Sequence, residues 1–473
     1  MQLTVGFDLD MTLVDTRVGV HSSMVQLAAE LGIPIDADLV VSRLGPPLEA
    51  ELAEWMPSDA VPAAADRFRE LMAESGAANC VALAGAVEAV RLVRASGGRV
   101  VVVTAKQASL AELTLAAVGI EVDAIHGWLW SDGKAVALRD EGASVYVGDH
   151  PHDVLGARGA GALSVGVRTG GTEPTDADVL LQDLTAFPAW YDEHLLDVRL
   201  DALAARLRDL GSVLVAFSGG ADSAFLLAAA VRALGPDAVV AATAVSPSLA
   251  TAELPAAAAF ADSLGVRHLT PGTDELSRDG YVANDGDRCF HCKATLLDTL
   301  RPLAASLDLA HVATGTNADD AVAGFRPGIR AAAERGAVTP LLDAGLTKQQ
   351  IRHASHRWGL ATADKPALAC LASRIAYGVS VTPSRLARVD RAETALREHL
   401  GDLVTDLRVR DLGDEQARIE LDPVALASCG ESALDVVRAE GFARVTAARY
   451  RSGSLNDALI SPGARPQMGL SDG

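Results

Sequence analysis

Cysteine is scarce in this chain. Five cysteines occur in 473 residues, a small and odd number that does not suit a framework of disulfides. The first residues, MQLTVGFDLD, lack the basic and apolar regions of a secretory signal. We therefore expect a cytoplasmic protein with reduced thiols. The five cysteines are Cys80, Cys289, Cys292, Cys370 and Cys429.

Basic residues are also few relative to acidic ones. The chain holds 41 Lys and Arg against 62 Asp and Glu, which gives a formal net charge of -21. General affinity for nucleic acid needs clustered positive charge, so we expect no nucleic acid partner. Uninterrupted apolar runs of roughly 18 to 20 residues are absent from the sequence, so we expect no membrane span.

What is present is a repeated alternation of short apolar runs and helix-length segments. Runs such as LTVGFDL, RVVVVTA, SVYVGD and SVLVAFS predict buried strands joined by crossover helices. The chain of 473 residues is longer than a single hydrophobic core usually supports, so more than one domain is expected. We expect an α/β protein with two doubly wound parallel-sheet domains and a small C-terminal α+β region. The predicted divisions are 1–190 with a helical cap at about 17–81, a linker at 191–200, a second domain at 201–378, an α+β region at 379–458 and a disordered tail at 459–473.

Two aspartates follow the first predicted strand, in FDLDMTLVD. Asp8 and Asp10 are two residues apart and leave the strand tip on one face. Such a pair can bind Mg2+, and one carboxylate can attack phosphorus while the other handles the proton of the leaving group. Taken alone, the pair is equally well read as a solvated acidic turn.

Later motifs favour the chemical interpretation. Thr104 ends a second strand, Lys134 lies in DGKAVAL, and Asp149 and Asp153 follow a third strand in VYVGDHPHD. In this order the motifs resemble the haloacid dehalogenase (HAD) superfamily, in which the usual glycine after the second aspartate is Met11 here. The resemblance implies a phosphatase with a Rossmann-like fold. Asp8 would be the nucleophile and Asp10 the general acid/base, Thr104 and Lys134 would bind the phosphoryl group, and the carboxylates would hold Mg2+. The predicted metal-site residues are Asp8, Asp10, Asp149 and Asp153.

A glycine-rich turn between a strand and a helix begins the second half, in VLVAFSGGADSAFLLAAA. Glycines let backbone N–H groups surround an anion, and the helix N-terminus adds partial positive charge. The pattern SGGxDS differs from the GxxxxGK[ST] loop and resembles the PP-loop of ATP pyrophosphatases, which cleave between the α and β phosphates. The predicted ATP-binding residues are Ser218, Gly219, Gly220, Asp222, Ser223 and, downstream in GTNADD, Asp319 or its neighbour Asp320.

Downstream motifs narrow this resemblance. NDGDRCFHCK, ATGTNADD, KPALACLASRIAYG, ARIEL and YRSGSLN, in this order, resemble the LarE family of ATP-dependent sulfur transferases over about 199–456. The resemblance implies adenylation of a carboxylate of pyridinium-3,5-biscarboxylic acid mononucleotide and its conversion to a thiocarboxylate, in synthesis of the nickel-pincer nucleotide cofactor. It implies ATP and Mg2+ as cofactors, a small nucleotide substrate, and other proteins of that biosynthesis as partners. We also expect a homo-oligomer.

Cys370 would be the sulfur donor on this resemblance. A free cysteine is otherwise most often a small buried hydrophobe. Arg374 on the same turn is the expected source of positive field for the thiolate. The resemblance also implies roles for Arg408, Arg410 and Glu420. They match positions that, in the LarE family, help bind the phosphate of the mononucleotide and the region of the donor cysteine. The family usually has proline where this chain has Ala376, which predicts a less rigid loop.

The motif RCFHCK leaves two routes open for the sulfur. Cys289 and Cys292 form one CxxC, which is too few ligands for a usual structural zinc site. Together with Cys370 they can hold three irons of a [4Fe-4S] cluster, as in some LarE-like proteins. The sequence therefore leaves two alternatives. Sulfur is transferred either through the cluster or from Cys370, which would lose its own sulfur atom. A PP-loop tRNA thiolase is a further alternative, which the acidic composition disfavours.

Overall fold

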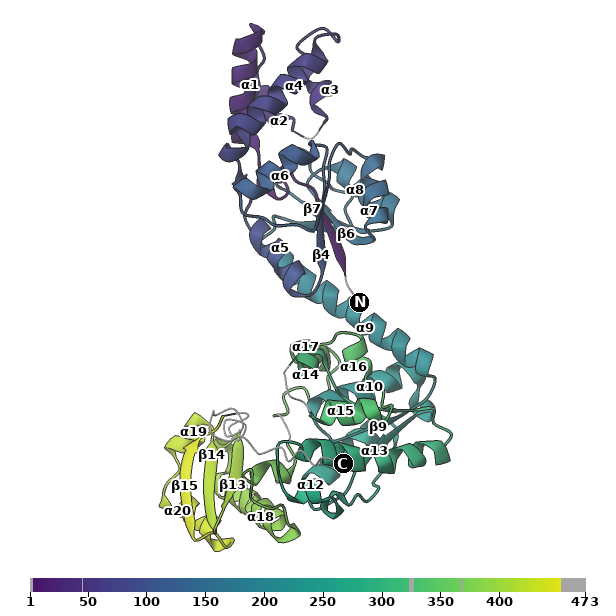
Figure 1. Ribbon diagram of the computed structural model, residues 1–473, viewed down its shortest axis with the longest axis vertical. Coiled ribbons are helices and arrows are strands. Elements are labelled where there is room, and N and C mark those ends of the chain that lie inside the picture. Colours follow the sequence, from purple (N-terminus) through teal and green to yellow (C-terminus); the bar gives the residue numbers. More distant parts are fainter. Residues whose placement is uncertain (1–2, 45, 323–326, 367–368, 452–473) are drawn as a thin grey trace, which may run out of the picture. The chain divides into compact units, whose positions relative to one another are not determined.

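The computed structural model describes residues 3–44, 46–322, 327–366 and 369–451, and it forms two compact units (Figure 1). The units are Met1–Leu195 and Leu196–Gly473, so the division falls inside the segment predicted as a linker. Helix α9, Phe187–Leu210, runs unbroken through that segment. The predicted tail at 459–473 and the preceding residues 452–458 lie outside the described residues. Within the described part, every helix is too short or too polar to cross a membrane.

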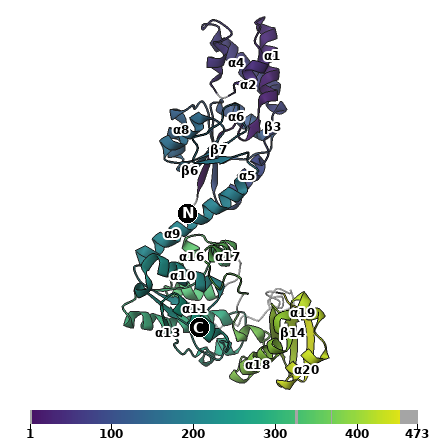
Figure 2. The ribbon, with the colours of Figure 1, turned by 180° about the vertical axis from the view of Figure 1, so that it is seen from behind.

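The first unit is built on a parallel sheet of six strands in the order β5-β4-β1-β6-β7-β8. Its inner strands are almost entirely buried, because helices cover both faces. Figures 1 and 2 show α5 and α6 on one side of the sheet and α7 and α8 on the other. The strands are β1 Thr4–Phe7, β4 Arg99–Val103, β5 Ala124–His126, β6 Ala143–Gly148, β7 Leu163–Val167 and β8 Val179–Leu181; the helices are α5 Ala86–Ala95, α6 Ala108–Ala117, α7 Asp132–Asp140 and α8 Pro151–Ala160.

A mostly helical insert separates β1 from the rest of this sheet. It begins and ends in a two-stranded antiparallel pair, in which Val14 lies opposite Ala82 and Asp15 opposite Val81. The pair brings together the two points at which the chain enters and leaves the insert. The elements are β2 Val14–Asp15, α1 Arg17–Leu31, α2 Ala37–Ser42, α3 Leu48–Leu52, α4 Val61–Leu71, a π-helical turn Met72–Gly76, a 3-10 turn Ala77–Asn79 and β3 Val81–Ala82.

The second unit contains a parallel sheet of four strands in the order β11-β10-β9-β12. The two parallel sheets confirm the predicted α/β class. The strands are β9 Val213–Ala216, β10 Val239–Ala242, β11 Arg267–Leu269 and β12 His311–Ala313. The helices are α10 Ala221–Leu234, α11 Glu253–Ser263, α12 Asp279–Val282, α13 Arg288–Ser306, α14 Ala318–Val322, α15 Pro327–Glu334, α16 Pro340–Asp343 and α17 Lys348–Arg357. Four short 3-10 turns in this unit are Pro236–Ala238, Glu275–Ser277, Leu371–Arg374 and Gly401–Leu403.

The C-terminal region forms a three-stranded sheet against two helices. The predicted hairpin is present, with β13 antiparallel to β14 and Arg410 opposite Arg418, and β15 adds in parallel. Its core is continuous with residues upstream, because Tyr281, Leu371 and Ile375 belong to the same buried cluster. The segment around Cys370 is therefore packed where the four-stranded-sheet part of this unit meets the C-terminal region. The elements are α18 Pro383–Leu400, β13 Leu407–Gly413, β14 Gln416–Leu421, α19 Pro423–Ala427, α20 Glu431–Ala439 and β15 Arg444–Arg449.

Candidate functional site

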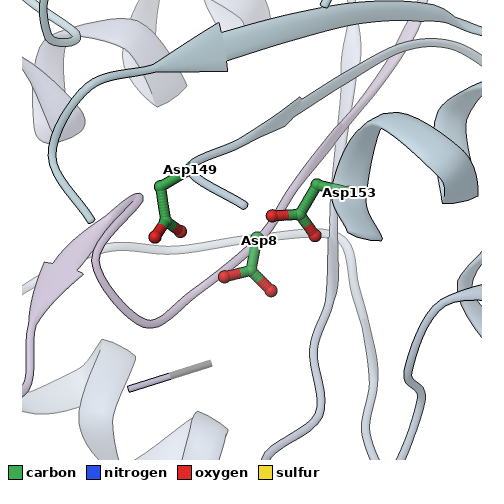
Figure 3. Close-up of side chains that lie close together, drawn as sticks. All are labelled: Asp8, Asp149 and Asp153. Atoms are coloured by element: carbon green, nitrogen blue, oxygen red, sulfur yellow. The ribbon is translucent and has the colours of Figure 1, made fainter. Parts of the chain in front are cut away.

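Three buried carboxylates meet at the carboxyl edge of the first sheet. Asp8 follows β1, Asp149 follows β6, and Asp153 lies in the first turn of α8. One oxygen from each lies within 4.8 Å of the others (Figure 3). Parallel strands bring their carboxyl ends to one edge, which explains why residues so distant in sequence converge. Carboxylate oxygens in this arrangement are ligands suited to Mg2+.

Lys134 is the buried cation of this cluster. Its ammonium group donates to Asp8 at 2.6 Å, to Asp153 at 2.6 Å and to the Tyr146 hydroxyl at 3.1 Å. Burial lowers the pKa of Lys134, but the charges of Asp153 and Asp8 outweigh it and hold the pKa well above its usual value. One ammonium against three carboxylates leaves excess negative charge, which a divalent cation would offset.

The carboxylates themselves titrate abnormally. Burial raises the pKa of Asp8 to about 7, although Lys134 opposes the shift. Burial and the charges of Asp8 and Asp153 likewise raise the pKa of Asp149 well above its usual value. The Thr12 hydroxyl donates to Asp149 at 2.8 Å and orients it. These raised pKa values favour a site whose natural occupant is a cation.

Asp10 differs from its prediction as a metal-site residue. Its side chain is not in the cluster of three and instead accepts from the Lys106 ammonium at 2.6 Å. Directly after Asp10 the chain turns sharply, since Met11 has a φ of 60°. This left-handed conformation explains why glycine is usual at that position. Thr104 is buried after β4, and its hydroxyl accepts from the Lys106 backbone N–H at 3.2 Å.

The glycine-rich loop of the second unit, Ser218 to Ser223, follows β9 and runs into the first turn of α10. Gly219 has a φ of 73°, and the hydroxyls of Ser218 and Ser223 are 3.1 Å apart across the loop. In the described chain, no side chain caps the N-terminus of α10. The loop thus presents helix N–H groups and two hydroxyls to an anion, as a pyrophosphate site requires.

Acidic and basic groups surround this loop. The Asn317 amide donates to Asp222 at 3.2 Å, and burial together with the charge of Asp320 raises the pKa of Asp222. Asp319, predicted to bind ATP, instead accepts from the backbone N–H of Lys348 at 2.7 Å. Asp320 is therefore the better-placed carboxylate of GTNADD, with the Lys348 ammonium 2.9 Å away.

Cys370 lies exposed at the start of the 3-10 turn Leu371–Arg374. Arg374, the expected source of positive field, forms a two-point ion pair with Glu393 at 2.9 and 3.1 Å. Its guanidinium also donates to the Cys370 carbonyl at 3.3 Å. Arg374 therefore holds the backbone at Cys370 and also adds positive charge near it.

The loop around Cys370 is fixed from two further directions. Arg410, 1% exposed, pairs with Glu420 at 2.9 Å and donates to the Ser373 carbonyl at 2.7 Å. The Ala376 N–H donates to the Asp411 carbonyl at 2.9 Å. Proline has no backbone N–H, so a proline at position 376 could not make this hydrogen bond. In this chain the hydrogen bond restrains the backbone where the proline ring would restrain it in other family members. The expected loss of rigidity is offset in this way.

Arg408 completes a group of three guanidinium groups. Burial and the neighbouring charges of Arg374 and Arg410 lower the pKa of Arg408. Its guanidinium stacks on Tyr450, 5.0 Å from the ring centre. Arg374, Arg408 and Arg410 thus gather three guanidinium groups near Cys370. This is a suitable place for a phosphate group.

The other two cysteines of interest lie near Cys370. Burial and then the nearby Cys370 thiol raise the pKa of Cys292. Burial lowers the pKa of Arg288, but Cys370 and Cys289 outweigh it and raise the value. Among the described residues, the three sulfurs are not within 4.8 Å of one another. The arrangement gathers the three thiols in one region without forming a compact single-ion site. Cys80 is buried and Cys429 half-buried, as expected for packing residues.

Sequence reasoning missed several basic residues of these sites. Arg288 donates to the Ala372 carbonyl at 2.8 Å, and Lys365 donates to the Gly219 carbonyl at 3.0 Å. The sequence did contain a signal that could have identified such residues, because lysine is rare in this chain. The chain has five lysines, Lys106, Lys134, Lys293, Lys348 and Lys365, and each lies beside one of the candidate sites.

Comparisons with known proteins find relatives of both units. The haloacid dehalogenase-like hydrolase family matches residues 5–158, and a second HAD-hydrolase-like family matches 131–188. A phosphoglycolate phosphatase of Caulobacter vibrioides is 31% identical over 199 residues, which cover 36% of this chain and 81% of the relative.

Two further relatives are longer matches. An uncharacterised protein of Synechocystis sp. is 41% identical over 273 residues, 56% of this chain and 99% of that protein. The pyridinium-3,5-bisthiocarboxylic acid mononucleotide synthase of Lactiplantibacillus plantarum is 34% identical over 262 residues, 54% of this chain and 93% of that enzyme. The chain therefore belongs to the LarE family of sulfur transferases and is an enzyme that carries a haloacid dehalogenase-like hydrolase domain in the same polypeptide.

Proposed function

We propose that the second unit converts a carboxylate of pyridinium-3,5-biscarboxylic acid mononucleotide to a thiocarboxylate, with Cys370 as the sulfur donor. The observation that carries the proposal is the placement of Cys370 on an exposed turn held by Arg374 and Arg410. A cysteine kept only for packing has no need of exposure or of such restraint. The relative in Lactiplantibacillus plantarum supports the substrate.

Adenylation is the first step of this proposal. The substrate carboxylate attacks the α phosphate of ATP and releases pyrophosphate. Ser218, Ser223 and the N-terminus of α10 bind the departing anion, and Asp222 with Asp320 would hold Mg2+. The cation group Arg374, Arg408 and Arg410 binds the phosphate of the mononucleotide.

Sulfur transfer follows at Cys370. Its thiolate attacks the acyl-adenylate and releases AMP, which gives a thioester. Loss of the Cα proton and cleavage of the Cβ–S bond then leave the thiocarboxylate on the product and dehydroalanine in the chain. Arg288 and Arg374 place positive charge close to Cys370.

A second candidate is transfer through a [4Fe-4S] cluster. The gathering of Cys289 and Cys292 near Cys370 favours it, because these are the three thiolates that such a cluster would need. The cluster would supply a labile sulfide at an iron without a protein ligand. In that case Cys370 would serve as a ligand and keep its own sulfur.

One experiment separates the two routes. The protein is purified without oxygen, its iron and visible spectrum are measured, and its intact mass is recorded after reaction with ATP, Mg2+ and the mononucleotide. A colourless protein that loses the elements of hydrogen sulfide at Cys370 supports the sacrificial route. A brown protein with unchanged mass supports the cluster, and a protein that forms no thiocarboxylate contradicts both.

For the first unit we propose a Mg2+-dependent phosphatase. Asp8 is the nucleophile, Asp10 donates the proton to the leaving group, and Lys134 offsets the charge of the attacked phosphate. Asp8, Asp149 and Asp153 would hold the Mg2+ that offsets charge on the phosphoryl oxygens. Release of phosphate by the wild type and not by Asp8→Asn tests this assignment; equal rates would refute it.

A further inference from the structure

The cavity above the three carboxylates has two chemically different ends. Asp8, Lys106 and Lys134 lie at one end, where the phosphate would be attacked. The opposite end is formed by the helical insert, where apolar side chains predominate and the charged residues Arg43, Glu49, Glu51 and Arg69 also line the cavity. It includes Val20, Met24, Val40, Leu48, Phe68 and Met72. A substrate must therefore place a phosphate at one end and an apolar body at the other.

Trp128 lies in the wall of this cavity, on the loop between β5 and α7. The loop is fixed to the phosphate end, because Trp128 N–H donates to the Lys106 carbonyl at 3.0 Å and Leu129 N–H to the Thr104 carbonyl at 3.0 Å. It packs so tightly that a Cβ on Gly127 would lie 2.3 Å from the Ala108 nitrogen. The backbone that carries the indole is thus held at a set place relative to Thr104.

The indole is exposed at an energetic cost. Trp128 has 54% of its surface exposed and a φ of 62°, in the left-handed region that bulky residues avoid. Such strain concentrates where ligands bind. The Arg69 guanidinium stacks 4.4 Å from the ring centre. An exposed and strained tryptophan in a cavity is best explained by a ring that packs against it.

The charges at the apolar end are already paired. Arg43 contacts Glu51 at 2.5 Å, and Arg69 forms an ion pair with Glu49 and another with Asp66 at 3.0 Å. Among the described residues that line this end, each arginine has a carboxylate partner. A second anionic group on the substrate would gain little here.

From these observations we infer that the first unit hydrolyses phosphate monoesters whose alcohol carries a planar aromatic ring, with nucleoside 5′-monophosphates as the fitting class. The inference rests on the proposed phosphatase function and adds the substrate class. Water attacks the aspartyl phosphate formed from Asp8, and the products are the nucleoside and inorganic phosphate. Small anionic esters such as phosphoglycolate and glycerol 3-phosphate, which lack a ring, are poorer substrates.

The test compares kcat/KM for adenosine 5′-monophosphate and glycerol 3-phosphate in the full chain with Mg2+. We expect the wild type to prefer the nucleotide by about tenfold or more, the range that stacking of one base supports. Trp128→Ala should lower that ratio about tenfold, mainly through KM. Because both rates come from one preparation, an unfolded fraction cancels. Trp190→Ala, outside the cavity on α9, is the matched control and should keep the ratio.

The outcomes separate this inference from the phosphatase function. If Asp8-dependent hydrolysis occurs but the wild type prefers glycerol 3-phosphate, or Trp128→Ala leaves the ratio unchanged, the inferred substrate class is wrong and the phosphatase stands. If Asp8→Asn matches the wild type on both esters, the phosphatase function fails, and the inference fails with it.

Discussion

The ammonium group of Lys134 lies 2.6 Å from a carboxylate oxygen of Asp8, and both side chains are buried. An ion pair in this position sets the charge of the nucleophile before any substrate arrives. The same ammonium contacts Asp153. Lys134 therefore joins the nucleophile to the metal-site residues, and its removal should affect chemistry more than binding.

Lys134→Met should lower phosphatase kcat by roughly a hundredfold or more, because the charge that develops on the phosphoryl group loses a preorganised cation. Steady-state kinetics against the best ester measures the loss. Lys106→Met tests a different role, since Lys106 pairs with Asp10. We expect that variant to shift the pH dependence of the leaving-group step. A Lys134→Met enzyme with normal kcat would contradict the assignment.

Mg2+ binding to the first unit should depend on pH near neutrality. The pKa of Asp8 is about 7 in the metal-free protein, so below pH 7 this ligand is mostly protonated. Mg2+ needs the ionised form and must displace the proton. Affinity should therefore fall as the pH is lowered from 8 to 6, and binding at pH 6.5 should release protons. Calorimetry in buffers of different ionisation enthalpy measures this release; no release would contradict the shift.

Two adjacent aspartates should behave differently in the second unit. Asp320 lies near Asp222 at the glycine-rich loop, whereas Asp319 accepts from a backbone N–H. Asp320→Asn should slow ATP-dependent release of pyrophosphate roughly tenfold or more through weaker Mg2+-ATP binding. Asp319→Asn is the matched variant and should slow it less. A larger loss in Asp319→Asn would reverse the roles assigned to the pair.

Breaking the buried pair of Arg410 and Glu420 should destabilise the second unit. Both side chains are only 2% exposed. Glu420→Gln leaves a buried guanidinium without its charge partner, which typically costs about 3 to 5 kcal/mol of unfolding free energy. Urea unfolding followed by circular dichroism measures the change. Glu431→Gln, whose carboxylate is 70% exposed, is the control and should cost less than about 1 kcal/mol.

The sequence predicted well what depends on strand ends and local patterns. Asp8, Thr104 and Asp149 follow buried parallel strands, and such strands place their carboxyl ends together whatever their separation in sequence. The pairing of β13 and β14 followed from alternating polarity in the same way.

The sequence could not supply contacts that depend on tertiary packing. The neighbouring sequence does not distinguish Asp319 from Asp320. Asp319 accepts from the backbone N–H of Lys348 because α17 packs beside it in the fold. Arg288 donates to the Ala372 carbonyl, 84 positions away in the sequence. Trp128 lines the cavity because its loop is hydrogen-bonded to the Lys106 carbonyl. Such contacts follow from the fold and have no short sequence pattern.

The central claim is that Cys370 is the residue through which sulfur is transferred. The most direct test is formation of thiocarboxylate from ATP, Mg2+ and the mononucleotide under anaerobic conditions, followed by mass spectrometry of the product. Cys370→Ala should form none, while Cys429→Ala, which removes a half-buried thiol elsewhere, should match the wild type. Thiocarboxylate formation by Cys370→Ala at the wild-type level would contradict the account.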